Sequence, residues 1–325
     1  MIVKHRTKPK ELYKLEAAVR RVTQTHPYYE RLQMDLKRKR RQITGEKEVD
    51  YPLRFLEEKE NLILHDLRLK DEQGYFQIDS LIICKKYCLI LEMKNWYGTI
   101  LFDENNQVIR IGDGGKEEGF PNPIPQAQLQ QYRLKKWLYK IGITAHPVEY
   151  LVVISFPSTI IKATPKSKIP ERVVHSKQLI FHIHKLDNLY NPTTITIRKP
   201  KNIAKRLVES HQESDRNFFD SYRITINDLI RGVFCPECSF VPMIREHQKW
   251  VCSKCGFQST DAHIQALSDY SYLISSTITN KAAREFLQVS SPHVVKRLLQ
   301  QGGYEQIGIN KGRKYRLDSL RIQNR

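Results

Sequence analysis

Two neighbouring segments in the first third of the chain are almost wholly apolar. The first runs from Gln77 to Ile83 and the second from Cys88 to Lys94, and the polar pair Lys85-Lys86 lies between them. Short apolar runs separated by a polar turn indicate two strands of a hairpin. The pattern therefore predicts a hairpin within a very hydrophobic sheet.

Three charged residues interrupt these strands. Asp79 lies in the first strand, and Glu92 and Lys94 end the second. Because strand side chains alternate between two faces, Glu92 and Lys94 point the same way, away from Leu91 and Met93. Charges near a core are costly unless they pair or hold a metal ion. We expect this cluster to be a metal site that carries chemistry.

Further helices and strands are expected around the hairpin. The expected helices span 1–42, Glu46–Glu60 behind a Thr44 cap, Gln126–Ile141, 177–190 and 202–214. The expected strands lie near Ile63–Leu67, Phe76–Ile83, Cys88–Lys94, Gly98–Phe102, Gln107–Ile111 and Tyr150–Phe156. This order predicts an α/β fold with helices packed on a mixed sheet.

Four of the six cysteines form two Cys-x-x-Cys pairs that are thirteen residues apart. They are Cys235, Cys238, Cys252 and Cys255. This spacing supplies four thiolates for one tetrahedral Zn²⁺ and leaves no open coordination position, so it predicts a structural zinc ribbon. A redox-active dithiol is the alternative interpretation. The other two cysteines, Cys84 and Cys88, fit buried thiols in a reducing compartment.

The C-terminal segment has a helix-turn-helix pattern. One helix is expected over Asn280–Leu287, and a second begins at Pro292 behind Ser291 as its cap. Two short strands then flank residues 310–313, which predicts a winged helix whose second helix enters the major groove of DNA. The expected DNA contacts are His293, Lys296, Arg297, Lys311, Arg313 and Lys314. A small helical bundle for protein contact is the alternative.

The charge of the chain points to a polyanionic partner. There are 54 Lys and Arg against 35 Asp and Glu residues, a formal net charge of +19. Such an excess favours nucleic acid first and an anionic membrane surface second. No apolar run is long enough for a membrane span, and the first residues do not form a secretory signal. We therefore expect a cytoplasmic protein with a nucleic-acid partner and no membrane partner.

Six short sequence elements follow one another between residues 42 and 155. They are Gly45-Glu46, Leu64-His65-Asp66-Leu67, Gln77-Ile78-Asp79, Ile90-Leu91-Glu92-Met93-Lys94-Asn95, Gly98-Thr99-Ile100 and Asn122-Pro123-Ile124-Pro125-Gln126. In these elements the chain resembles the nuclease-related domain (NERD) family of the restriction-endonuclease-like, or PD-(D/E)XK, nucleases. The resemblance covers about a third of the chain. It implies a restriction-endonuclease-like mixed sheet flanked by helices.

The resemblance also implies roles for the charged cluster. Asp79 and Glu92 are oxygen donors suited to Mg²⁺ or Mn²⁺, the backbone carbonyl of Met93 is a further ligand, and Lys94 assists the attacking water. Supporting roles fall to Glu46 and Gln126. Each of these two has rivals on its own helix, namely Glu48, Glu57, Glu58 and Glu60 for the first and Gln128, Gln130 and Gln131 for the second.

The chain is expected to divide into four parts. These are a basic helical arm (1–42), a nuclease-like domain (43–230, core 43–156), a zinc ribbon (231–260) and a winged helix (265–325). The expected function is a Mg²⁺-dependent deoxyribonuclease, with RNA not excluded as a substrate and a homodimer left open. The alternative is a DNA-binding or regulatory protein that keeps a nuclease-like fold with little cleavage.

Overall fold

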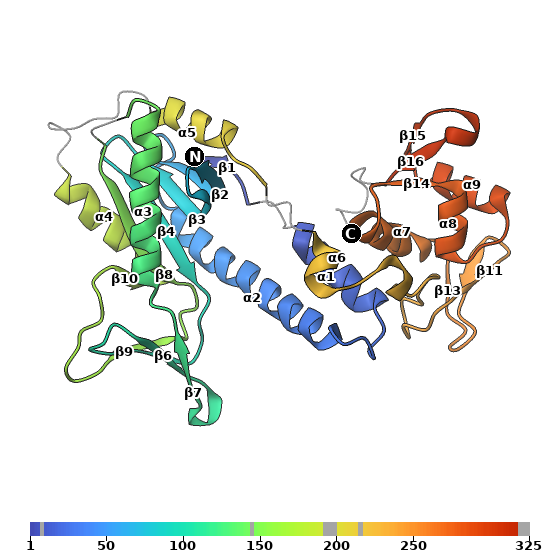
Figure 1. Ribbon diagram of the computed structural model, residues 1–325, viewed down its shortest axis with the longest axis horizontal. Coiled ribbons are helices and arrows are strands. Elements are labelled where there is room, and N and C mark those ends of the chain that lie inside the picture. The colour runs from blue at the N-terminus through green and yellow to red at the C-terminus, as the bar shows by residue number, and fades with distance from the viewer. Residues whose placement is uncertain (7–9, 144–145, 191–199, 214–216, 318–325) are drawn as a thin grey trace. The chain divides into compact units, whose positions relative to one another are not determined.

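The computed structural model describes residues 1–6, 10–143, 146–190, 200–213 and 217–317 (Figure 1). The chain separates into two compact units, each made of two stretches of sequence. The first unit comprises Met1–Thr7 and Arg40–Asp215, and the second comprises Lys8–Lys39 and Arg216–Arg325. The division into four parts that the sequence suggested is a finer one than these two units, and it stays a prediction.

A six-stranded mixed sheet forms the centre of the first unit. Its strands, in spatial order, are β1 (Ile2–Lys4), β2 (Leu62–Asp71), β3 (Gly74–Ile83), β4 (Cys88–Lys94), β8 (Val148–Ile154) and β10 (Val173–His175). β2, β3 and β4 form an antiparallel meander. β1 runs parallel to β2, and β8 runs parallel to both β4 and β10. The predicted α/β class and the β3–β4 hairpin are confirmed.

Helices cover both faces of this sheet. α3 (Pro123–Lys140) and α5 (Pro200–Glu209) pack on one face, where Leu134 and Leu207 join a buried cluster with Ile90 and Val152. The C-terminal half of α2 (Tyr29–Leu53) and α4 (Leu179–Leu189) pack on the other. The strands are buried on both faces and therefore read as continuous apolar runs. Figure 1 shows α3 lying along the strands.

α2 differs from the helix expected in this region, which was to begin after Thr44 and reach Glu60. The observed helix is continuous from Tyr29 to Leu53, and the Thr44 hydroxyl donates to the carbonyl of Arg40 (3.1 Å) instead of capping a helix start. Pro52 lies in the last turn and has no N–H to donate, so the hydrogen-bond ladder cannot continue. The helix therefore ends seven residues before Glu60.

Gly45 lies in the middle of α2 because the helix approaches the sheet closely there. A Cβ atom at this position would lie 1.7 Å from Asn95 Oδ1 and 3.1 Å from Ser155 Cβ. Glycine costs about 1 kcal/mol relative to alanine inside a helix. The close contact with the ends of β4 and β8 explains why glycine is nevertheless present, and it places the following residue, Glu46, beside the sheet.

A second sheet of four strands follows β4. Its order is β7 (Glu117–Phe120), β6 (Val108–Ile111), β5 (Thr99–Phe102) and β9 (Ile160–Ala163). β5 and β9 are parallel, and the other neighbours are antiparallel. Two short 3₁₀ helices, Asp113–Gly115 and Ser176–Gln178, complete the first unit.

The second unit has two buried clusters. One joins α1 (Lys10–Arg21), the N-terminal half of α2 and α6 (Phe218–Tyr222) through residues such as Leu15, Leu32 and Tyr222. The other is shared by the cysteine-rich segment and the C-terminal helices. A salt bridge from Arg21 to Asp269 (2.8 Å), in which both side chains are 1% exposed, ties α1 to α7 (His263–Leu273).

The C-terminal part contains the elements that the sequence predicted together with one additional strand. The segment holds α8 (Asn280–Leu287), α9 (Pro292–Gln301), β15 (Glu305–Ile307) and β16 (Lys314–Arg316). The additional strand, β14 (Thr277–Thr279), pairs with β16. The cysteine-rich segment forms a separate sheet of β11 (Ile244–Glu246), β12 (Lys249–Val251) and β13 (Gln258–Ser259), and Ile226–Asp228 is a 3₁₀ helix.

Candidate active site

Asp79 lies where β3 and β4 separate. Their ladder ends at the pair Ser80 and Leu91, and Asp79 is the residue that precedes Ser80 on β3. Beyond that point the N–H of Met93 donates to Asp79 Oδ2 (2.8 Å). The carboxylate thus takes the place of a backbone acceptor and is held at the opening between the two strands.

Asp79 is unusually basic for a carboxyl group. Burial of the group and the negative charge of Glu92 raise the pKa of Asp79 from 3.8 to about 7, although the Met93 N–H and the charge of Lys94 act in the opposite direction. Two carboxylates therefore compete for ionisation in one place, as expected when like charges are held together away from water.

Glu92 and Lys94 form an ion pair on the face covered by α3. Lys94 Nζ lies 2.7 Å from Glu92 Oε1 and donates to Gln126 Oε1 at 2.9 Å. Glu92 is 2% exposed, so its charge depends on such partners. The expectation from strand alternation that these two side chains share a face agrees with their contact. Gln126, one of four glutamines considered on this helix, contacts Lys94.

Gln130 is a site residue that the sequence left only as a rival. It is one turn after Gln126 on α3, so the two side chains share a helix face. Its Nε2 donates to Glu92 Oε2 (2.7 Å) and to the carbonyl of Gln77 (3.0 Å). Its Oε1 is buried and has no hydrogen-bond partner among the described residues. The i, i+4 spacing of Gln126 and Gln130 was the available signal.

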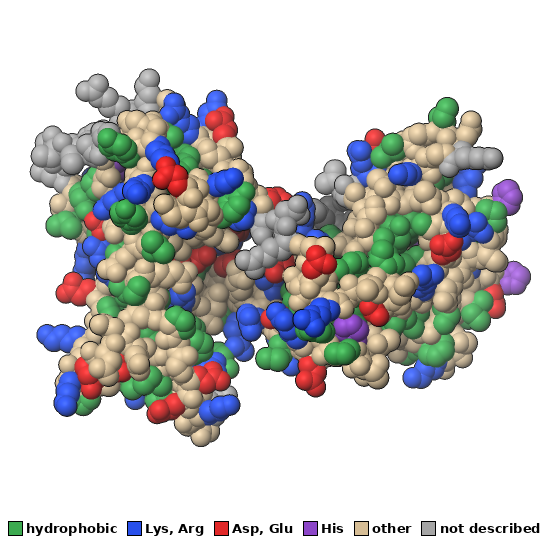
Figure 2. Space-filling view, in the orientation of Figure 1, with side chains coloured by type: hydrophobic (Ala, Val, Ile, Leu, Met, Phe, Trp, Pro, Cys, Tyr) green, Lys and Arg blue, Asp and Glu red, His purple; other side chains and the backbone are tan. Residues whose placement is uncertain are grey.

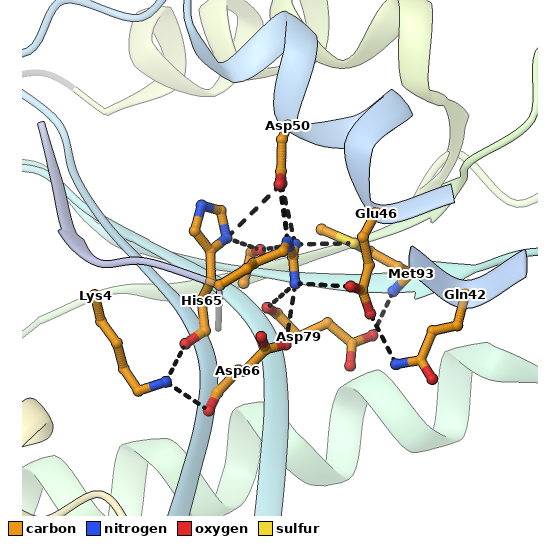
Figure 3. Close-up of polar contacts among 10 residues, drawn as sticks. Lys4, Gln42, Glu46, Asp50, His65, Asp66, Asp79 and Met93 are labelled. Atoms are coloured by element: carbon orange, nitrogen blue, oxygen red, sulfur yellow. Dashed lines mark hydrogen bonds and ion pairs between the residues drawn. The ribbon is translucent and has the colours of Figure 1, made fainter. Parts of the chain in front are cut away.

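Glu46 lies beside Arg6, which also contacts Asp79. It is 8% exposed, accepts from Gln42 Nε2 (2.7 Å) and lies 4.0 Å from Arg6 Nη1. The same Arg6 nitrogen donates to the carbonyl of Asp79 (3.3 Å). Figure 3 shows Glu46, Gln42 and Asp79 around this contact.

Two arginines lie over the ring of Tyr97, three residues after Lys94. The Arg41 guanidinium carbon is 4.2 Å from the ring centroid, and that of Arg110 is 4.3 Å away. Hydrogen bonding to Arg41 and then to Arg110 lowers the pKa of Tyr97. The Tyr97 ring thus contacts two guanidinium groups just beyond the end of β4.

The four predicted cysteines come together in the second unit. Their Sγ atoms all lie within 4.8 Å of one another, with Cys235 to Cys255 at 3.7 Å and Cys238 to Cys252 at 3.6 Å. Four thiolates around one zinc at the usual bond length would be separated by about 3.8 Å. The cluster could thus hold one zinc ion with little movement. Gly256, at φ +73°, makes the tight turn expected after the second pair.

The basic residues proposed for the C-terminal segment are largely on its surface. His293, Lys296 and Arg297 are exposed on α9, and Val295 and Leu298 are buried on its other side. Lys314 is exposed and Arg313 half-buried, and the Lys311 side chain lies outside the described residues. Figure 2 shows lysine and arginine side chains spread over the visible face with acidic ones among them. Net charge alone therefore does not mark a binding surface.

The first unit has a mixed sheet with a buried carboxylate (Glu92), a half-buried one (Asp79) and a paired lysine at the end of its central strands, which is an arrangement suited to nuclease chemistry. Residues 41–155 match the family model of the nuclease-related domain. The chain thus contains a nuclease-related domain, and the match covers about a third of its length. Searches of curated proteins and of solved structures each gave no significant match. Among the described residues, no helix has both the length and the apolar character needed to cross a membrane.

Proposed function

We propose that this protein hydrolyses phosphodiester bonds in DNA with Mg²⁺ or Mn²⁺ as cofactor, and that its second unit binds DNA. The observation that carries the proposal is the set of Asp79, Glu92 and Lys94 at the point where β3 and β4 separate inside a nuclease-related domain. RNA remains among the substrates to be tested.

The carboxylates fit a divalent cation. Mg²⁺ is usually bound by one or two carboxylates while it keeps several waters. Asp79 and Glu92 supply two, and a cation between them would offset the burial and the repulsion that together raise the pKa of Asp79. The carbonyl of Met93 is a third candidate donor. When bound, the metal supplies an acidified water and polarises the scissile phosphate.

Lys94 is held ready for the charge that develops during hydrolysis. An ammonium has three donors. Two are directed at Glu92 and Gln126, which fix the position of Nζ at 2.7 and 2.9 Å. The third can donate to the attacking water or to a phosphate oxygen, where it stabilises negative charge in the transition state.

The glutamines and Glu46 support this arrangement. Gln130 fixes the second oxygen of Glu92, and its buried Oε1 can accept a hydrogen bond from an ordered water. Glu46 adds negative charge near Asp79 from α2. Arg41 on Tyr97 is exposed and suited to contact a phosphate beyond the cutting point, whereas Arg110 is paired with Glu118.

The second unit supplies the proposed attachment to DNA. A zinc ion at the four cysteines would be structural, since all four positions are thiolates. α8, α9 and the β15–β16 hairpin are proposed to act as a winged helix, with His293, Lys296 and Arg297 directed at the duplex and Arg313, Lys314 and Lys311 in the wing. A homodimer and a cytoplasmic location belong to the same proposal.

Cleavage by the purified full chain tests the catalytic part. We expect nicking or cutting of duplex DNA only with Mg²⁺ or Mn²⁺, and we expect Lys94→Ala to reduce it at least a hundredfold while DNA binding stays within twofold. The readouts are plasmid cleavage and a gel-shift titration. Single-stranded DNA and RNA are compared in the same assay.

An exposed lysine on α3, Lys135, provides the matched control. Lys135→Ala removes the same charge outside the site and should cut normally. Activity without divalent cations, or full activity of Lys94→Ala, would overturn the catalytic assignment. DNA binding by a protein that does not cut under any of these conditions would favour the regulatory alternative.

A further inference from the structure

Arg6 belongs to the first unit although it precedes residues 41–155, which match the nuclease-related domain. It follows β1, which runs parallel to β2 at the edge of the sheet. Its side chain is only 12% exposed. A guanidinium removed from water to this extent is costly unless acceptors surround it.

Acidic side chains from two elements surround the Arg6 guanidinium. Nε lies 2.9 Å from Asp50 Oδ2 and Nη2 lies 3.1 Å from Asp50 Oδ1, which is a two-pronged contact with α2. Nη1 lies 3.0 Å from Asp66 Oδ1 on β2. Glu46 Oε2 is 4.0 Å away. Arg6 thus offsets the charge of carboxylates from α2 and β2.

The same guanidinium holds the backbone of β3. Nη1 donates to the carbonyl of Asp79 (3.3 Å), and Nη2 donates to Ser80 Oγ (2.8 Å). Ser80 Oγ is in turn 2.7 Å from His65 Nδ1, and burial together with the charge of Arg6 lowers the pKa of His65 to about 3. A neutral imidazole can accept a hydrogen bond from the Ser80 hydroxyl. Ser80 can therefore accept from Arg6 and donate to His65 at the same time.

Arg6 contacts β2 and β3 at the point where their pairing is irregular. The ladder pairs His65 with Ser80 and Leu67 with Ile78, so Asp66 and Asp79 lie opposite each other without being paired. Asp66 has φ +51°, a left-handed conformation that costs a non-glycine residue energy. Lys4 Nζ donates to the Asp66 carbonyl (3.2 Å), as Figure 3 shows. Two residues of the N-terminal segment therefore bind this irregular point. Lys4 binds the carbonyl of Asp66, and Arg6 binds the Asp66 carboxylate and the Asp79 carbonyl.

We propose that Arg6 is a positioning residue of the active site. By binding the Asp79 carbonyl and the carboxylates of Asp50 and Asp66 at once, it fixes the direction in which the Asp79 carboxylate leaves β3. That direction brings Oδ2 to the N–H of Met93 and the rest of the carboxylate to the opening beside Glu92. This role rests on the proposed function only where it concerns the metal ion.

The test uses a pair of variants in the full chain. Arg6→Gln leaves Asp50 and Asp66 without their partner and can fail to fold. The double variant Arg6→Gln/Asp50→Asn removes one charge of each sign and keeps the balance of the cluster. Arg68→Gln is the matched control, since Arg68 is on β2 and donates to the exposed carbonyls of Gln212 and Glu213.

Two measurements separate this proposal from the proposed function. Hydrogen exchange of the Met93 amide needs no metal, and we expect it to be at least tenfold faster in the double variant while the Ile90 amide is unchanged. Mn²⁺ binding, followed by electron paramagnetic resonance, should be at least tenfold weaker in the double variant. The single variant Arg6→Lys, which keeps the positive charge, should bind Mn²⁺ with an affinity between those of the double variant and the wild type. The control Arg68→Gln should match the wild type in both.

A folded double variant with wild-type exchange at Met93 would overturn the positioning role. Faster exchange at Met93 with unchanged Mn²⁺ affinity would overturn it as well, because the carboxylate would then bind metal without Arg6. If the wild type itself binds no Mn²⁺, the proposed function fails, and exchange at Met93 still decides whether Arg6 positions Asp79.

Discussion

At the scale of single residues, Asp79 shows how one side chain serves two purposes. Its Oδ2 satisfies the Met93 N–H that the parting of β3 and β4 leaves without a strand partner, and its charge is held close to Glu92. A structural carboxylate would be stabilised by a cationic partner that lowers its pKa. The raised pKa of Asp79 instead indicates that the ionised carboxylate is strained where it lies, by burial and by the charge of Glu92.

This strain predicts an inverse dependence of stability on pH in protein without divalent cations. The pKa of Asp79 is about 7 in the folded state against 3.8 ordinarily, so the folded protein retains a proton that the unfolded chain releases. Between pH 4 and 7 this term lowers the free energy of unfolding as pH rises, by about 1.4 kcal/mol for each unit in which the full proton difference exists.

Urea unfolding in magnesium-free buffer at pH 5, 6 and 7.5 measures this effect. Asp79→Asn keeps an acceptor for the Met93 N–H but cannot ionise, so it should gain stability relative to the wild type as pH rises. Mg²⁺ should stabilise the wild type more at pH 7.5 than at pH 5. A difference between wild type and variant that does not change with pH would contradict the assignment.

Gly45 gives a second prediction at this scale. Alanine is the better helix former, yet its Cβ would overlap Asn95 Oδ1 at 1.7 Å. We expect Gly45→Ala to reduce the free energy of unfolding by roughly 1–3 kcal/mol, as is usual for overpacking. Gly119→Ala is the control, since no atom lies within 4 Å of its added Cβ. Urea unfolding of the two variants decides the matter.

At the scale of elements, α9 is the segment proposed to contact DNA directly. Its apolar side, including Val295, Leu298 and Leu299, is buried, and its other side exposes Lys296 and Arg297. Ser291 caps its start by accepting from the N–H of Val294. The helix is thus fixed to its unit by one side and available to a polyanion by the other.

Charge removal on α9 should change the salt dependence of DNA binding. We expect Lys296→Gln/Arg297→Gln to weaken binding and to reduce the slope of log affinity against log salt by about 1.8, since each phosphate contact contributes about 0.9. The control Lys201→Gln/Lys205→Gln removes two exposed charges from α5. Equal slopes in the two double variants would leave the winged-helix assignment without support.

The elements differ in how well the sequence predicts them. β3, β4 and β8 follow from local apolar patterns, because both faces of each are buried. The end of α2 was misplaced although Pro52 marked it, and its start was misplaced because Thr44 and Gly45 resemble a helix boundary. Glycine is present at position 45 because the helix lies close to Asn95 and Ser155 there, and these residues are distant in the sequence. β1, expected to be helical, is three residues long and owes its conformation to β2.

The site shows the same limit. The contact of Glu92 with Lys94 could be predicted because the two residues interrupt an apolar strand at a spacing of two. Gln130 was one of several equivalent glutamines until helix and sheet were placed together. Arg6 had no signal, since its hydrogen-bond partners lie 44 to 87 residues away in the chain. Residues that position others are found only when the fold brings distant segments together.

At the scale of the whole molecule, zinc binding by the four cysteines would be joined to the folding of the second unit. Cys235 and Cys252 are buried in one cluster with Trp250, Leu267 and residues of α8 and α9. Loss of zinc would leave four thiolates close together beside this core. The cysteine-rich segment and the C-terminal helices should therefore lose stability together.

Limited proteolysis with and without a zinc chelator tests this coupling. We expect new cleavage within residues 217–317 after chelation and unchanged protection within 41–190. Cys255→Ser should give the same cleavage pattern without a chelator. It should lower the free energy of unfolding by several kcal/mol, although Cys255 is exposed. Cleavage that spreads equally through both ranges, or no change in either, would refute separate folding of the two units.

The position of β1 also affects where this enzyme candidate can be divided. A fragment that began at residue 41, the first position of the family match, would lack the strand that pairs with Ile63 and Leu64 at the start of β2. β2 is mostly buried, so the backbone groups freed at its start would offer a template for other chains. Self-association of such a fragment would then reflect a missing neighbour rather than a property of the domain, and the smallest unit that behaves like the native protein includes residues 2–6.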